Sequence, residues 1–397
     1  MEAIDIQSGA FRLYWFLMGK VFKAGGKSFS PQEHILVIAE IGTGHNGSVH
    51  KAQELISAAK ESGADAVKFQ IVYADEILHP DTGFVELPTG RIPLYDRFKE
   101  LECGIDFYAE LACYAQKQGM LFSASAFGLR SADELRQLKP AFVKIASPEL
   151  NHFPLLEQVA SFRLPVILST GVSRLGDIER AVDCMEAHGV SAEMRALLHC
   201  VTAYPAPETD YNTAVLQPLS SIFNSPVGIS DHSLDPAAVP LAALVSGACI
   251  IEKHICLSRM DAGLDDPVAL EPAQFLQMTR IVRNVTGKSR EAVFAAAKDY
   301  GYSKDFLQRI IGNGEKKLAA AEKNNYGKTN RSLHYLKSLP AGTVLKSSDI
   351  ALLRTEKNLS AGESPEFLCH FIGAVLQRDV TGGAGAVLDD IIARQNI

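Results

Sequence analysis

Eight short apolar runs, separated by stretches with helical spacing, restrict the fold of this chain more than any other feature of its sequence. The stretch 48–63 is typical: it begins at a capping Ser, repeats small and apolar residues at helical spacing, and stops at Gly63. This alternation predicts an α/β fold, a parallel (β/α)8 or TIM barrel. An open doubly wound sheet is the alternative. The runs cover residues 35–41, 66–70, 121–127, 142–147, 165–171, 195–201, 227–232 and 249–255.

The pattern divides the chain into four parts. Residues 71–120 exceed one helix and contain several Gly and Pro residues, so we expect a loop insertion on the active face of the barrel. After a last helical pattern the sequence becomes polar, and then shows short strand patterns split by turn residues. We therefore predict an N-terminal extension over 1–34, a barrel over 35–290, a linker over 291–330 and a small β-rich domain over 331–397.

The composition narrows the class of partner and the cellular setting. A formal charge of −7 over 397 residues gives no overall reason to expect nucleic acid. The seven cysteines include no CxxC pair, so we expect buried free thiols in a reducing cytoplasm. The apolar segment near the N-terminus is interrupted by Arg12, Lys20 and Lys23 and is too short to span a membrane. We expect it to pack on the body of the protein or on a partner subunit.

Polar residues collect at the ends of the eight runs. In a barrel of this type, the C-terminal strand ends and the loops that follow them build the active site. Taken singly, most of these residues have ordinary explanations, and we interpret His199 as a hydrogen-bonded core residue. Their coincidence on one rim is what predicts a site. The set comprises Glu40, Lys68, Gln70, Ser123, Ser125, Lys144, Ser147, Glu149, Ser169, Thr170, Ser230, Asp231, His232, Glu252, Lys253 and His254.

These residue types fit one kind of chemistry. His232 and His254 follow adjacent strands and can share one divalent metal, which leaves positions open for a substrate oxygen. Glu40 and Glu149 are the candidate acid and base. A small dianion that carries phosphate and carboxylate can be held by Lys68, Gln70, Ser125, Lys144, Ser147 and Ser169.

Two other functions fit the same residues. In a class I aldolase, Lys68 or Lys144 would form a Schiff base with the substrate, and chelators would have no effect. In a non-catalytic sugar- or ice-binding module, the barrel would be a scaffold. Such a scaffold has no need for buried Lys and Glu side chains at its strand ends, so the pattern favours an enzyme.

Seven motifs occur in order along the barrel, and an eighth follows them. They read AEIGTGHNG (39–47), AAKESGADAVKFQ (58–70), VKIASPELNHFPLL (143–156), VILSTG (166–171), LLHCVTAYPAP (197–207), GISDHS (228–233), IIEKHI (250–255) and GLDDPVALEP (263–272). The tail from NRSLHYLKSLPAGTVL (330–345) onward is similar to an antifreeze-like (SAF) domain. With these motifs the chain resembles the sialic acid synthases, which include N-acetylneuraminate synthase and its legionaminate, pseudaminate and 9-phosphate relatives.

The resemblance implies a reaction and the residues that carry it out. Phosphoenolpyruvate condenses with the open-chain aldehyde of an N-acetylmannosamine-type sugar, and phosphate is released. A divalent metal, usually Mn²⁺ with Mg²⁺ or Co²⁺ as alternatives, is held by residues that match His232 and His254. The contacts to phosphoenolpyruvate match Lys68, Gln70, Ser125, Lys144, Ser147, Ser169 and Ser230. The sugar contacts match Tyr204, Asp265 and Arg354, and the catalytic candidates are Glu40, Glu149 and Lys144.

The resemblance also implies an assembly. In the family, an Arg from the SAF domain of the partner subunit enters the sugar site, which implies a domain-swapped homodimer with Arg354 in that role. The sequence departs from the family pattern nearby. Gly44 stands where Asn is usual, Ala126 where Pro is frequent, and Asp266 where His is common. These departures spare the His pair and the lysines, and they leave the identity of the amino sugar and its phosphorylation open.

Overall fold

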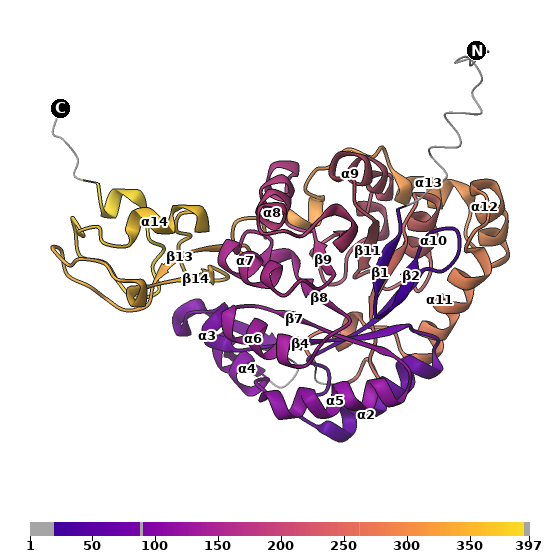
Figure 1. Cartoon of the computed structure of the whole chain (residues 1–397), viewed down its shortest axis with the longest axis horizontal. Coiled ribbons are helices and arrows are strands. Elements are labelled where there is room, and N and C mark those ends of the chain that lie inside the picture. The colour runs from indigo at the N-terminus through magenta and orange to yellow at the C-terminus, as the bar shows by residue number, and fades with distance from the viewer. Residues whose placement is uncertain (1–19, 88–89, 262, 393–397) are drawn as a thin grey trace, which may run out of the picture.

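The computed structural model describes residues 20–87, 90–261 and 263–392, and at its centre is a closed barrel of eight parallel strands (Figure 1). Every strand lies within two residues of the apolar run that predicted it, so the predicted fold is confirmed. The strands are buried on both faces, which is why each reads as a nearly continuous apolar run. They are β3 (Leu36–Gly42), β4 (Ala66–Ile71), β7 (Leu121–Ala126), β8 (Phe142–Ile145), β9 (Val166–Ser169), β10 (Arg195–Cys200), β11 (Val227–Asp231) and β12 (Ile250–His254).

A helix follows each barrel strand and packs on the outside of the ring (Figure 1). In the first of them, Ser48 accepts a hydrogen bond from the amide of Lys51, and the apolar face is buried as its spacing predicts. Among the described residues, no helix is long and apolar enough to cross a bilayer. The outer helices are α2 (Val49–Glu61), α5 (Ile105–Lys117), α6 (Leu129–Gln137), α7 (Phe153–Ser161), α8 (Leu175–Ala187), α9 (Leu216–Phe223), α10 (Ala238–Val245) and α11 (Pro272–Val285).

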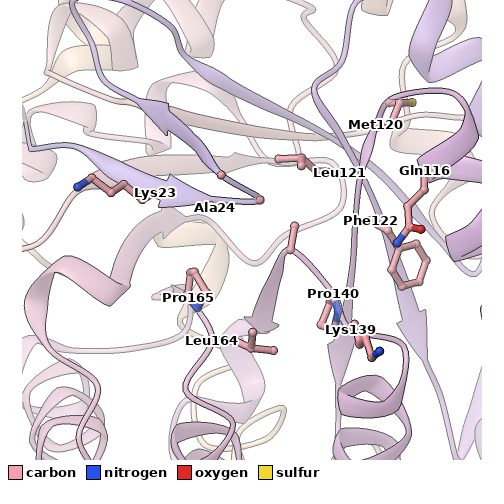
Figure 2. Close-up of a pocket in the computed structure, with 13 residues that line it drawn as sticks. Lys23, Ala24, Gln116, Met120, Leu121, Phe122, Lys139, Pro140, Leu164 and Pro165 are labelled. Carbon is pink, nitrogen blue, oxygen red and sulfur yellow. The ribbon is translucent and has the colours of Figure 1, made fainter.

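An antiparallel hairpin of β1 (Phe22–Ala24) and β2 (Lys27–Phe29) closes the N-terminal end of the barrel. Phe22 and Phe29 are wholly buried against residues at the strand starts. This part of the predicted N-terminal extension therefore packs on the body, whereas residues 1–19 lie outside the described residues. A pocket between the hairpin and the turns before β7, β8 and β9 opens at this end (Figure 2), opposite the polar site described below.

The predicted loop insertion after β4 contains small elements of its own. They are α3 (Ala74–Ile77), the hairpin of β5 (Phe84–Leu87) and β6 (Gly90–Pro93), and α4 (Leu94–Glu100). A small apolar cluster that includes Val72, Ile77, Leu78, Leu94 and Phe127 holds this insertion on the barrel.

The segment 291–330 is ordered and packed, which corrects our prediction of a linker. It contains most of α12 (Arg290–Asp299) and all of α13 (Lys304–Ile311), and α13 packs on α10. Leu307, Ile310 and Ile311 are buried because the helix is strongly amphipathic. The polar composition of residues 312–330 reflects many hydrogen bonds to the barrel rather than freedom to move.

The C-terminal domain forms its own small core at one end of the molecule (Figure 1). Its strands β13 (Arg331–Tyr335) and β14 (Ile350–Arg354) pair antiparallel, and α14 (Leu368–Phe371) follows them. The register places Arg331 directly opposite Arg354. Two positive charges at directly opposed positions repel each other and destabilise the strand pair. A negatively charged group that contacts both arginines would offset this repulsion.

Candidate active site

The register of the barrel brings polar side chains from neighbouring strands to one level. Glu40 lies opposite Lys68, Gln70 opposite Ser125, and Ser125 opposite Lys144. The Lys68 ammonium lies 2.5 Å from Glu40 Oε2 and donates to Ser125 Oγ at 3.2 Å. Gln70 donates to the other oxygen of Glu40 at 2.9 Å. The predicted residues of β3, β4, β7 and β8 thus form one buried cluster.

Glu252 of β12 joins the two lysines of this cluster. Its carboxylate lies 3.8 Å from Lys68 Nζ and 3.6 Å from Lys144 Nζ. Ser230 of β11 donates to the same carboxylate at 2.9 Å. The sequence pattern places Glu252 on the rim but indicates no role for it, because its position between two lysines depends on closure of the barrel.

Two ammonium groups and two carboxylates make the cluster close to neutral. Burial acts to lower the pKa of Lys68, but the charges of Glu252 and Glu40 outweigh it and the pKa is raised. Burial also lowers the pKa of Lys144, and Glu252 offsets this only in part. Burial alone would raise the pKa of Glu252, but Lys144 and Lys68 lower it. The two ammonium groups are the charged hydrogen-bond donors of this cluster that can bind an incoming polyanion.

Hydroxyl groups from the next strands face the same space. Ser147 Oγ accepts a hydrogen bond from the amide of Gly171 at 3.0 Å and also contacts the buried thiol of Cys200. Ser169 Oγ is buried and has no hydrogen-bond partner in the described part of the chain. Buried polar atoms without partners are rare and commonly mark a bound ligand or water.

His232 and His254 converge at the ends of β11 and β12. Their ring centres lie 5.6 Å apart, and the ring of Tyr204 stacks on His232 at 4.2 Å. His254 Nδ1 lies 3.9 Å from a carboxylate oxygen of Asp265. His232 Nδ1 lies 3.0 Å from the carbonyl oxygen of Val201, which can only accept. The proton is therefore on Nδ1, and Nε2 presents a lone pair.

The donor set fits a divalent transition metal. Burial lowers the pKa of both His232 and His254, so both rings are neutral near pH 7, as metal ligation requires. Asp265 adds a carboxylate beside the two imidazoles. Imidazole and carboxylate suit Mn²⁺, Fe²⁺, Co²⁺ or Zn²⁺.

Glu149, just after β8, is held by two arginines of the C-terminal domain. Its Oε1 accepts from Arg331 at 3.0 Å and from Arg354 at 2.7 Å. All three side chains are largely or wholly buried. Glu149 lies between the two opposed arginines and accepts hydrogen bonds from both. Its role as a catalytic acid or base stays a prediction.

The arginine that the resemblance assigned to a partner's site contacts its own barrel here. Arg354 donates to Glu149 of the same chain, and the neighbouring Arg331 exchanges hydrogen bonds with Asn151 of that barrel. One chain can thus bring the arginine to the rim of its own site. The domain-swapped homodimer stays a prediction.

Some residues of the predicted rim are structural. Ser123 donates to the carbonyl of Phe142, and Thr170 to that of Leu198. His199 Nε2 lies 2.6 Å from a carbonyl oxygen, and burial lowers its pKa to about 3. It is the ordinary core residue that we expected.

Lys253 points away from the site, and its replacement should test stability alone. It is fully buried and bonds to Asp231 at 2.6 Å and to the carbonyl oxygen of Ser233 at 2.7 Å. Side chains alternate along a strand, so Lys253 faces outward between the inward Glu252 and His254. We expect Lys253→Met to lower the free energy of unfolding by about 3–5 kcal/mol, because Asp231 loses its partner. Urea denaturation measures this change, and an unchanged midpoint would contradict it.

Two functional candidates escaped sequence reasoning. Arg331 begins β13, whose sequence RSLHY holds only two apolar residues although all five are buried, and Glu322 lies in a polar stretch that we interpreted as a linker. Both are essentially inaccessible to solvent. Nothing in the local pattern marked either residue.

Comparison with known proteins decides the family. The sequence profile of the NeuB family matches residues 55–292, and that of the SAF domain matches residues 330–392. The chain belongs to the NeuB family. The resemblance to the sialic acid synthases, with barrel and SAF domain, is thereby confirmed.

Several relatives in the NeuB family align over most of their length. The spore coat polysaccharide biosynthesis protein SpsE of Bacillus subtilis is 30% identical over 94% of this chain and 98% of its own. The N,N'-diacetyllegionaminic acid synthase of Legionella pneumophila is 31% identical over 90% of this chain and 94% of its own. The crystal structure of SpsE superposes with a TM-score of 0.79, covering 94% of this chain and 100% of that one. The relatives also include N-acetylneuraminate-9-phosphate synthases and a pseudaminic acid synthase.

Proposed function

We propose that this protein condenses phosphoenolpyruvate with the open-chain aldehyde of an N-acylated mannosamine-type sugar. The products are a nine-carbon 2-keto sugar acid and phosphate. One observation carries the proposal: two buried lysines, with serine hydroxyls beside them of which that of Ser169 has no partner, adjoin a pair of neutral histidines at the C-terminal end of the barrel. The names of relatives that make legionaminic, pseudaminic and neuraminic acids support it.

The site divides into three regions in this proposal. The anion cradle for phosphoenolpyruvate consists of Lys68, Gln70, Ser125, Lys144, Ser147, Ser169 and Ser230. The sugar is bound by Tyr204, Asp265 and Arg354. A divalent metal, which we propose to be Mn²⁺, is held by His232 and His254 and supplies a Lewis acid for the aldehyde oxygen.

The chain's own residues position the reactants and move protons. Lys68 and Lys144 balance the charges of the phosphate and carboxylate groups, so that C3 of phosphoenolpyruvate, its methylene carbon, can approach the aldehyde carbon. A carbon–carbon bond forms between these two atoms, the aldehyde oxygen takes up a proton to become a hydroxyl, and C2, which bears the phosphate, becomes electrophilic. Glu40 takes a proton from the water that adds to C2. Phosphate then leaves with cleavage of its carbon–oxygen bond, and the 2-keto group remains.

A phosphate-release assay tests the proposal. Phosphoenolpyruvate is supplied with Mn²⁺ and a panel of N-acylated hexosamines, free and 6-phosphorylated. We expect phosphate release that depends on one member of the panel and stops with a chelator. Sugar binding without turnover would replace the proposal with a binding module. Borohydride trapping of pyruvate on Lys144, with no effect of chelators, would replace it with a class I aldolase, a role that the lowered pKa of Lys144 would suit.

Replacing Arg354 should weaken use of the sugar more than use of phosphoenolpyruvate. Its guanidinium sits at the rim over Glu149, away from the lysines. We expect Arg354→Ala to raise the KM for the sugar by about 10- to 100-fold, because a charged hydrogen-bond donor is worth about 1.5–3 kcal/mol. Steady-state kinetics with each substrate varied in turn measure this. An unchanged sugar KM would remove Arg354 from the sugar site.

A further inference from the structure

Residues 312–330, which we call the strap, bind the loops that follow β9 and β10. Glu322 lies at the middle of the strap and is wholly buried. Its Oε1 accepts from the amide of Val172 at 2.7 Å and from the amide of Thr202 at 2.8 Å. Its Oε2 accepts from the amide of Ala319 in the strap itself at 3.1 Å. One carboxylate thus joins three segments of the chain.

The strap also binds the carbonyl groups of the same two loop residues. Asn330 donates to the carbonyl of Val172 and Asn325 to that of Thr202, each at 3.1 Å. Both backbone groups of Val172 and of Thr202 therefore have partners in the strap. Lys316 adds a bond to the carbonyl of Thr170 at 2.9 Å. A segment that only connected two domains would not need five hydrogen bonds to these two short loops.

The loop after β9 needs such support because its backbone is strained. Val172 has a φ of +41°, in the left-handed region that β-branched residues rarely occupy. Conformations of this kind persist only where the surroundings hold them, and they gather at functional sites. The contacts to Glu322 and Asn330 lie on the two sides of this residue.

The same loop forms one wall of the anion cradle. The amide of Gly171, next to Val172, donates to Ser147 Oγ. A Cβ at position 171 would clash with Thr202 Oγ1 and lie 2.9 Å from Ser147 Oγ, so the loops are closely packed. Ser169, with its unpartnered hydroxyl, ends the strand that leads into the loop. Displacement of Val172 would therefore move the hydroxyls of Ser147 and Ser169.

We propose that Glu322 is a positioning residue, which fixes the β9 and β10 loops so that the hydroxyls of Ser147 and Ser169 are preorganised for the anionic substrate. The inference rests on the proposed function for the identity of that anion, phosphoenolpyruvate. The strap continues directly into Arg331, which bonds to Glu149. The strap therefore contacts the loops beside the anion cradle and also leads into the residue that binds the SAF domain to the barrel.

Three variants of the full-length protein separate positioning from general stability. Glu322→Ala removes both acceptor oxygens and with them three hydrogen bonds, Glu322→Gln keeps an amide oxygen that can accept from Val172 and Thr202, and Glu315→Gln changes an exposed carboxylate of the same strap. We expect Glu322→Ala to raise the KM for phosphoenolpyruvate by about tenfold or more, and more than the KM for the sugar. Glu322→Gln should restore most of this loss, and Glu315→Gln should match the wild type. A folded Glu322→Ala with the wild-type KM for phosphoenolpyruvate would overturn the proposal.

Hydrogen exchange gives a readout that does not depend on turnover. In the wild type, peptides that contain Val172 and Thr202 should exchange slowly, and Glu322→Ala should expose both amides. If Glu322→Ala does not fold, Asn330→Ala loosens the carbonyl of Val172 instead, and both its exchange and its KM for phosphoenolpyruvate should rise. Fast exchange of both amides in the wild type would overturn the proposal, even if the protein used another substrate. Slow exchange without turnover of phosphoenolpyruvate would instead contradict only the proposed function.

Discussion

Replacing His232 by alanine is expected to reduce phosphate release from phosphoenolpyruvate by at least about 10³-fold, because a Lewis acid contributes several kcal/mol to such a reaction. The ring presents Nε2 to the site, since Nδ1 is bound to the carbonyl of Val201. One imidazole cannot hold the metal as two do, so the variant should also lose the tightly bound ion. Metal content after dialysis and turnover at saturating Mn²⁺ are the two measurements.

A surface cluster provides the control for metal content. One ligand atom each of Glu157, Cys184 and His188 lies within 4.8 Å of the others, on the outer helices. A second ion bound at this cluster would raise the number of metal ions measured per chain. Cys184→Ser removes one ligand of the cluster and is therefore the matched control. It should keep both turnover and the metal that His232→Ala loses. Wild-type turnover of His232→Ala at saturating Mn²⁺ would show that the proposed metal ligands are wrong.

Replacing Lys144 by methionine is expected to lower kcat/KM for phosphoenolpyruvate by about 10²- to 10³-fold. Lys144 lies 3.6 Å from Glu252, and Lys68 lies 2.5 Å from Glu40. Without Lys144, the cluster holds two carboxylates and one ammonium, and its net negative charge repels a polyanion. Methionine fills a similar volume, so the effect should come mainly from the lost charge.

Lys253→Met is the matched comparison for this prediction. Lys253 is one residue from Glu252 on β12, but its ammonium bonds to Asp231 outside the barrel. That variant should lose stability and keep the KM for phosphoenolpyruvate, whereas Lys144→Met should raise this KM. Equal changes of KM in both variants would mean that Lys144 acts through stability and does not contact the anion.

Much of the site could be predicted because, in a parallel barrel, the position of a residue along its strand determines how close it lies to the C-terminal rim. Lys68 and Gln70 are two residues apart on one strand, so they face the same side, and the ends of parallel strands meet at one rim. Position along a strand does not reveal which carboxylate pairs with which lysine. Glu252 and Lys253 are adjacent and equally buried, yet one faces the cradle and the other a structural ion pair.

The eight strands, the helices between them and the polar residues at the strand ends could all be predicted from the amino-acid pattern. They follow from local periodicity, which depends only on near neighbours along the chain. Three contacts become visible only in the folded protein: Glu252 joins two lysines, Glu149 binds two arginines of the SAF domain, and Glu322 binds two loops. Each of these contacts joins segments far apart in sequence, and each satisfies a buried charge whose partner no local pattern can specify.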